Sequence, residues 1–309
     1  MLFIVTTVDT YLMKNSKLIY IAGPTASGKT ALAIALAKHY NTEIISCDSR
    51  QFYKEMTVGT AVPSTEELSE VNHHFIQHLS ITHPYTVGDY QKDTLALLKK
   101  LFKKHDVVLM VGGSGLYADA VMQGLDEFPE VDPAIRPQLT AIYQQEGIGV
   151  LQDLLREQDI HHYHRVDKNN PHRLIRALEI SLSSGKPYSS FLGKKESPNF
   201  FTPQTIVIDW DRPALYDRIN HRVDQMIDWG LESEAKELYP NKTLNALQTV
   251  GYREWFAYFD GKWDRNRAIE EIKKNSRRYA KRQTTWFKRY ATALRIPGNN
   301  DIDFILKQL

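Results

Sequence analysis

The segment that starts at Gly23 holds the residues best suited to chemistry in this chain. It fits the pattern G-x-x-x-x-G-K-[ST], which is typical of loops that bind phosphate groups. The glycines let backbone N–H groups turn inward, and a helix that begins there adds positive potential. Lys29 supplies a point charge and Thr30 a hydroxyl that can bind Mg²⁺. The segment predicts a site for a di- or triphosphate. Its residues are Gly23, Pro24, Thr25, Ala26, Ser27, Gly28, Lys29 and Thr30.

The flanking sequence predicts the elements that hold this loop. The apolar run Leu18–Ala22 precedes it as an expected strand, and residues 30–37 follow as an expected helix. Three further runs, Glu43–Cys47, Val107–Val111 and Thr205–Ile208, have the composition of buried strands. Helical stretches between the first three give the alternation of a doubly wound parallel sheet. We therefore expect an α/β fold whose ligands bind at the carboxyl ends of the strands.

Polar residues follow two of these expected strands. Asp48 ends the second run and is a candidate general base or orienting acceptor, although an Asp in this place also caps turns. Gly112 and Gly113 follow the third run, where an NTP hydrolase usually carries an acid, which argues against a motor or switch ATPase. Ser114 adds a hydroxyl there. A tight turn between strand and helix is the alternative interpretation of this segment.

Two arginines and a basic segment could bind anions. Arg218 and Arg222 are four residues apart, so on a helix they share a face and could clamp a leaving diphosphate. A solvated basic face is the alternative. The segment from residue 273 to 289 holds eight Lys and Arg residues interleaved with Tyr279, Trp286 and Phe287. It predicts either a nucleic-acid surface or an amphipathic helix that buries its aromatic side chains, and both readings stay open.

Length, composition and net charge limit the class of protein. The chain has 309 residues, 42% of them hydrophobic and 25% charged, with a net charge of +2. These values are ordinary for a globular protein, so any polyanion site must come from local clustering. The one cysteine excludes an internal disulfide and agrees with a cytoplasmic location. Residues 1–16 lack the features of a signal peptide and are expected to be an extension. No apolar run is long enough to span a membrane.

Between residues 121 and 204 the strand pattern stops. Asp132-Pro133 and Asn170-Pro171 each combine a capping residue with a proline suited to the first helical position, and Gly185 is a plausible helix end. These signals predict an all-helical insertion. After Asp209 we expect helices to near the end of the chain.

Taken together, the motifs resemble those of tRNA dimethylallyltransferases, in the family's order and over most of the chain after residue 17. Beyond the phosphate loop, the matching segments are 48–53 (DSRQFY), 59–61 (GTA), 112–117 (GGSGLY), 170–179 (NPHRLIRALE), 250–253 (VGYR) and 280–286 (AKRQTTW). The resemblance implies a P-loop NTPase-like core, residues 1–120 and 205–309, and a helical insertion, residues 121–204, that contacts the tRNA anticodon stem-loop. It implies transfer of dimethylallyl from its diphosphate to the N6 amine of the adenine 3′-adjacent to the anticodon.

The same resemblance assigns expected roles. The catalytic residues would be Asp48, Lys29, Ser114 and Arg218. The whole phosphate loop with Arg218 and Arg222 would bind the diphosphate, and Thr30 would bind Mg²⁺. The tRNA would contact Asp48, Ser49, Arg50, Gln51, His172, Arg173, Arg176, Gly251, Tyr252, Arg253, Lys281 and Arg282. We expect a monomer.

Three other functions are weighed against this one. An adenylate isopentenyltransferase would use the same fold on a free nucleotide, but the insertion argues against it. A P-loop small-molecule kinase would need ATP in the loop and a lid of arginines. A non-catalytic RNA-binding protein is disfavoured because Lys29, Thr30 and Asp48 are all present.

Overall fold

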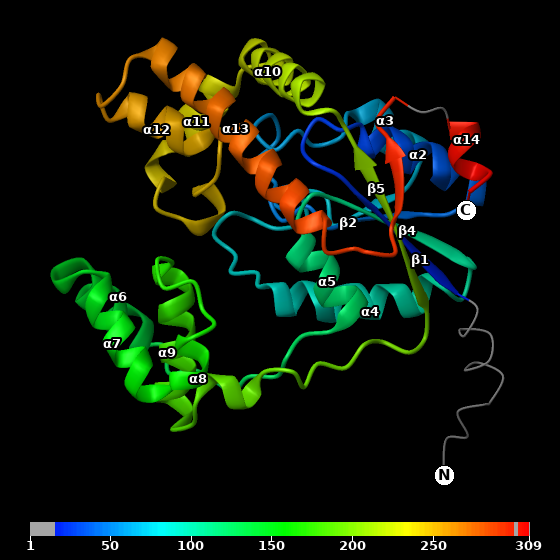
Figure 1. Cartoon of the computed structure of the whole chain (residues 1–309). Helices are drawn as coiled ribbons and strands as arrows, with labels where there is room; N and C mark the ends of the chain where they lie inside the picture. The colour runs from blue at the N-terminus through cyan, green and yellow to red at the C-terminus, as the bar shows by residue number, and fades with distance from the viewer. Residues whose placement is uncertain (1–15, 300–301, 309) are drawn as a thin grey trace. The chain divides into compact units, whose positions relative to one another are not determined.

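The structure of the protein, a computed structural model, describes residues 16–299 and 302–308 (Figure 1). It divides into two compact units. One is built from the chain up to Met122 together with the chain from Pro198 onward, and the other is Gln123–Ser197. The expected extension at residues 1–16 lies, except for Ser16, outside the described residues.

The first unit is built around a six-stranded sheet in which every pair of neighbouring strands is parallel. The strand order is β3-β2-β4-β1-β5-β6. The strands are β1 Lys17–Ala22, β2 Ile44–Ser46, β3 His73–His74, β4 Val107–Val111, β5 Thr202–Asp209 and β6 Leu294–Pro297. The predicted α/β class with a parallel sheet is confirmed.

Both faces of the central strands are buried. Leu18 and Tyr20 of β1 belong to a large hydrophobic cluster on one face, which also contains side chains of α4, Val87–Leu101. Ile19 and Ile21 point to the other face, against α2, Lys29–Tyr40. A parallel strand that is covered on both sides carries apolar residues at every position. The central strands could be recognised from sequence for this reason.

Further helices complete the first unit, and α13 packs against both α10 and α12 (Figure 1). They are α3 Thr65–Glu70, α5 Gly115–Gln123, α10 Arg212–Asp228, α11 Leu231–Leu238, α12 Tyr252–Phe259, α13 Arg265–Phe287 and α14 Ile302–Leu306. No helix of the described chain has the length and apolar character needed to cross a membrane.

The edges of the sheet differ from the expectation. The edge strands β3 and β6 were not predicted, and β6 lies near the end of the chain, after the helices expected beyond Asp209. Each is short, and they contain His73, His74 and Arg295, so neither shows an apolar run. β5 begins at Thr202, earlier than the expected Thr205, because its polar first residues pair with the start of β1. An edge strand or strand end needs no continuous apolar sequence, and pattern analysis therefore misses it.

The second unit is helical. Its helices are α6 Ile135–Glu146, α7 Ile148–Gln158, α8 Ile160–Tyr163 and α9 Pro171–Ser184. The side chain of Asn170 caps α9, proline occupies its first turn, and Gly185 ends it with φ 66°, as its sequence predicts. The helix expected to start at Pro133 begins instead at Ile135, because Asp132 accepts a hydrogen bond from the Ala134 N–H in a preceding turn.

Candidate active site

The loop between β1 and α2 has the backbone of an anion site. Ala26 and Gly28 both lie in the left-handed region, with φ 63° and 90°. Gly28 caps α2, and no side chain accepts a hydrogen bond from the first N–H groups of this helix. A Cβ on Gly23 would lie 2.6 Å from the Ser27 hydroxyl, so the close turn requires glycine. The free N–H groups at the start of α2 can therefore receive an anion.

Three side chains from outside the loop hold its backbone in place. The indole Nε1 of Trp210 donates to Ser27 O at 3.0 Å, and Nε of Arg218 donates to Ala26 O at 2.9 Å. Gln283 of α13 accepts from the Thr25 N–H at 2.9 Å and donates to Gly113 O at 3.0 Å. The loop is thereby tied to the ends of β5 and β4 and to helices α10 and α13.

Three cations face this loop. Burial, and then the charge of Arg222, lower the pKa of Lys29 to about 8, and its ammonium donates to Pro24 O at 2.8 Å. Burial also lowers the pKa of Arg222, whose guanidinium makes no hydrogen bond or ion pair with any described residue. Arg218 lies over the ring of Trp210 at 4.4 Å, and its terminal nitrogens remain unbonded. Such clustered, unpaired donors suit a polyphosphate.

Asp48 lies opposite these cations. It follows β2, and its Oδ1 accepts a hydrogen bond from the Arg50 N–H at 3.1 Å. Its carboxylate makes no ion pair with a described residue, yet it raises the pKa of both Lys29 and Arg222. A carboxylate that forms no ion pair and lines a cationic pocket is suited to accept a proton or a hydrogen bond.

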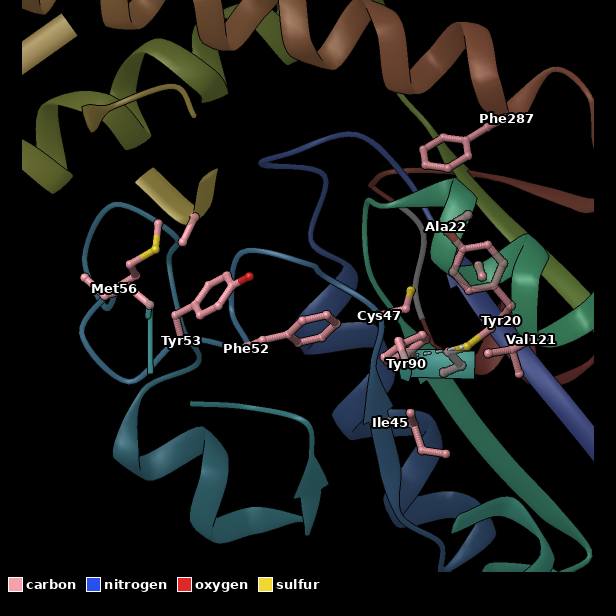
Figure 2. Close-up of a cluster of buried hydrophobic side chains, with 14 of the residues drawn as sticks. Tyr20, Ala22, Ile45, Cys47, Phe52, Tyr53, Met56, Tyr90, Val121 and Phe287 are labelled. Carbon is pink, nitrogen blue, oxygen red and sulfur yellow. Dashed lines mark hydrogen bonds between the residues drawn. The ribbon is translucent and has the colours of Figure 1, made fainter. Parts of the chain in front are cut away.

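Aromatic packing fixes the segment that carries Asp48. Figure 2 shows Phe52 and Tyr90 in the buried cluster near Cys47. The rings of Phe52 and Tyr90 stack with centroids 5.3 Å apart, and the Tyr90 hydroxyl donates to Ser46 O at 3.0 Å. The residues on both sides of Asp48 are thus anchored in the core, which positions the carboxylate.

These groups line one cavity of about 880 Å³ in the first unit. Of the predicted site residues, those that line it are Thr25, Ala26, Gly28, Lys29, Thr30, Asp48, Ser49, Arg50, Gln51, Arg218, Arg222, Gly251, Arg253 and Arg282. The volume exceeds what a small diphosphate fills and leaves room for a second ligand group.

Other predicted residues of the first unit do not line the cavity. Gly23, Pro24 and Ser27 are the buried residues of the phosphate loop, and they determine its conformation without lining the cavity. The Ser114 hydroxyl bonds the N–H and the hydroxyl of Ser49, each at 3.1 Å, and so supports the Asp48 segment. Its catalytic role stays a prediction.

The Tyr252 side chain does not line the cavity either, and a tRNA contact at this position stays a prediction. Tyr252 has no exposed surface, and its hydroxyl donates to Glu234 Oε1 at 2.7 Å. The two oxygens of Glu234 also accept from the N–H groups of Thr57, Val58 and Gly59, at 2.7 to 2.9 Å. Tyr252 therefore helps to hold the loop at the cavity wall.

Comparison with known proteins places this geometry in a family. The profile described as IPP transferase matches residues 51–290, which is more than half of the chain. The chain belongs to the IPP transferase family.

Individual relatives agree. The chain is 58% identical over 275 residues to the tRNA dimethylallyltransferase of Christiangramia forsetii, which covers 89% of this chain and 91% of that protein. It is 56% identical over 278 residues to the tRNA dimethylallyltransferase of Flavobacterium johnsoniae, and the match covers 88% of this chain and 90% of that protein. The crystal structure of the tRNA isopentenylpyrophosphate transferase of Bacillus halodurans is similar, with a TM-score of 0.70 and 37% identity. The match covers 95% of this chain and 94% of that chain.

The basic helix α13 of this IPP transferase buries one side and exposes the other. Phe287 is only 1% exposed and belongs to the core, so it cannot stack on a base. Lys273 pairs with Asp224, and Lys274 pairs with Glu271. Lys281 and Arg282, by contrast, are exposed and make no ion pair with a described residue. Lys281 and Arg282, near the C-terminal end of the helix, therefore carry charge that no acid of the described chain neutralises.

The predicted tRNA contacts of the second unit share one helix face. His172, Arg173 and Arg176 are exposed on α9, opposite the buried Leu174 and Leu178. Arg176 forms an ion pair with Glu179 of the same helix. Arg173 makes no ion pair within the described chain, so it has the freer charge for an RNA phosphate.

Three residues of the site were assigned no role from sequence. Gln283 lies within a segment that matches the family, so its position gave a signal. Trp210 follows Asp209 directly at a strand end, which is a weaker signal. Glu234 is an ordinary charged residue of α11, and nothing in the sequence connects it to Thr57–Gly59, which lie far away along the chain.

Proposed function

We propose that this IPP transferase moves a dimethylallyl group from dimethylallyl diphosphate to the N6 amine of the adenine 3′-adjacent to the anticodon in tRNA. One observation carries the proposal. A single cavity is lined by the cations Lys29, Arg218 and Arg222, none of which forms an ion pair with a described residue, and by the carboxylate of Asp48. The names of the relatives supply the identity of the transferred group and of the acceptor.

The residues fit the electron movement of this reaction. A bond forms between N6 and C1 of the allyl chain while the C1–O bond breaks, and its electron pair leaves with the diphosphate. Positive charge develops on the allyl carbons, so the main demand is to stabilise the departing anion. The loop N–H groups, Lys29, Arg218 and Arg222 supply that stabilisation before the reaction begins.

Asp48 suits the other half of the reaction. The N6 amine is a weak nucleophile because its lone pair is conjugated with the ring. A hydrogen bond from N6–H to Asp48 would orient the amine toward C1, and the carboxylate can accept the proton that N6 loses. The adenine must leave the stack of the anticodon loop to reach this acid, at a cost of a few kcal/mol.

The residues also fit a bound Mg²⁺. The Thr30 hydroxyl lines the cavity and makes no hydrogen bond with a described residue, and Asp48 offers a second oxygen there. Oxygen donors combined with substrate phosphates are the usual environment of Mg²⁺. When bound, the ion would neutralise charge on the diphosphate. We assign Thr30 to hold it. A monomeric state and a cytoplasmic location remain predictions.

Analysis of the product tests the proposal. An unmodified tRNA transcript is incubated with the enzyme, dimethylallyl diphosphate and Mg²⁺, and its nucleosides are identified by mass spectrometry. We expect dimethylallyl on the adenine beside the anticodon and none in a transcript that has guanine there. Modification at other adenines, or none, would contradict the assigned acceptor.

A further inference from the structure

The outer end of α10 carries the most exposed of the large apolar side chains in the described chain. Trp229 directly follows the last residue of this helix, and 63% of its surface is exposed. Its indole makes no hydrogen bond, ring stacking or cation contact with any described residue. A large flat ring without a partner is suited to a ligand that offers another flat surface.

Trp229 is part of the cavity wall. Arg218, Arg222, Met226 and Trp229 recur at helical spacing along α10, and all four line the cavity. This wall changes from guanidinium groups near the phosphate loop to a thioether and then to the indole at the rim. The eleven residue steps from Arg218 to Trp229 span about 16 Å along a helix.

That distance separates Trp229 from the prenyl donor. With the diphosphate held by Arg218 and Arg222, a dimethylallyl chain extends only about 5 Å further, given bonds of about 1.5 Å. In the proposed reaction the acceptor adenine lies in the same cavity, at Asp48. A group at the distance of Trp229 therefore meets what lies beyond the adenine, which is the neighbouring part of the RNA.

The surroundings of Trp229 favour the same partner. Arg253 and Gln248 line the same cavity. Arg253 is exposed, and its guanidinium makes no hydrogen bond or ion pair with a described residue. An exposed aromatic ring and a free cation on the wall of one cavity are the combination that binds unpaired nucleotides, since the ring can stack on a base and the cation can contact a phosphate.

We propose that the indole of Trp229 stacks on the anticodon-loop base that adjoins the target adenine, and so holds the loop open around it. The inference rests on the proposed function and adds a positioning residue for its RNA substrate. Trp229 does not touch the reacting atoms, so it should act on RNA binding and not on the chemical step.

The test uses the full-length enzyme and anticodon stem-loop RNA hairpins. Wild type, Trp229→Ala and Trp229→Phe are compared, with Phe304→Ala as the control, because Phe304 is also exposed but does not line the cavity. Fluorescence anisotropy gives the Kd for each hairpin, and label transfer gives kcat and both KM values. Loss of one stacked base should raise the Kd and the KM for RNA about tenfold in Trp229→Ala. The kcat and the KM for dimethylallyl diphosphate should stay within about twofold, and Trp229→Phe should recover most of the affinity.

Hairpins with an abasic site 5′ or 3′ of the target adenine complete a double-mutant cycle. We expect one of the two abasic sites to weaken binding by wild type and not to weaken binding by Trp229→Ala any further. If both abasic sites lowered the affinity equally and their effects added to that of Trp229→Ala, the inference would be overturned. Transfer to RNA by wild type would still support the proposed function. Absence of transfer to RNA by wild type would overturn both.

Discussion

At the scale of single residues, the titration of Lys29 gives a specific pH dependence. Burial and the charge of Arg222 hold its pKa at about 8, well below the ordinary value for lysine. A bound diphosphate favours the charged ammonium, so above pH 8 binding must take up a proton. We expect the Kd for dimethylallyl diphosphate to be nearly constant from pH 7 to 8 and to rise by up to about tenfold per pH unit above that.

Calorimetric titration across this pH range measures the effect. Lys29→Arg provides the control, because a guanidinium stays protonated throughout. The rise should disappear in this variant. A rise that persists unchanged would mean that another group controls the pH dependence.

The role of Asp48 belongs to the same scale. Asp48→Asn keeps the size of the side chain and the oxygen that accepts from the Arg50 N–H, but the amide cannot take a proton. We expect kcat to fall by about 10²- to 10⁴-fold, the usual range for loss of a general base, with the Kd for RNA nearly unchanged. Single-turnover kinetics and anisotropy measure the two quantities. Parallel losses in both would point to a binding role instead.

At the scale of elements, one side chain of α13 links the loop to the sheet. Gln283 joins Thr25 N–H and Gly113 O, and Gln283→Met would keep its volume while leaving both backbone groups without a partner. We expect a loss of roughly 1–3 kcal/mol in the free energy of unfolding and a higher KM for the diphosphate. Lys288→Met, at the residue that directly follows this helix, is the control, since Lys288 is exposed. Chemical denaturation should separate the two variants, and equal stability would show that the bridge contributes little.

The elements also show how far the sequence could predict the site. The loop at Gly23 and the buried strand Leu18–Ala22 were predictable because short-range patterns define them. The edge strands at His73 and Leu294 were not, since neither has an apolar face of its own. The hydrogen bonds from the N–H groups of Thr57–Gly59 to Glu234 could not be predicted either, because they join segments distant in the chain. Short sequence motifs thus indicate candidate ligand-binding residues. The long-range hydrogen bonds that fix their positions cannot be read from such motifs.

At the scale of the whole molecule, the small net charge of +2 means that RNA binding depends on where free cations lie. Lys281 and Arg282 are exposed and unpaired, whereas Lys273 and Lys274 of the same helix are neutralised by acids. We expect Lys281→Ala with Arg282→Ala to weaken tRNA binding and to lower the slope of log Kd against log salt by about one to two. Lys273→Ala with Lys274→Ala is the matched control and should leave the slope nearly unchanged. Equal slopes in both double variants would assign α13 a structural role only.

The most direct test of the account is transfer of radiolabelled dimethylallyl from its diphosphate to unmodified tRNA, run beside AMP under the same conditions. We expect label in tRNA and none in AMP, because the chain carries the helical insertion and its relatives are named tRNA dimethylallyltransferases. Label in AMP would make the protein a free-nucleotide prenyltransferase. Absence of label from both acceptors, together with binding of ATP in the loop, would contradict the proposed function and favour a kinase.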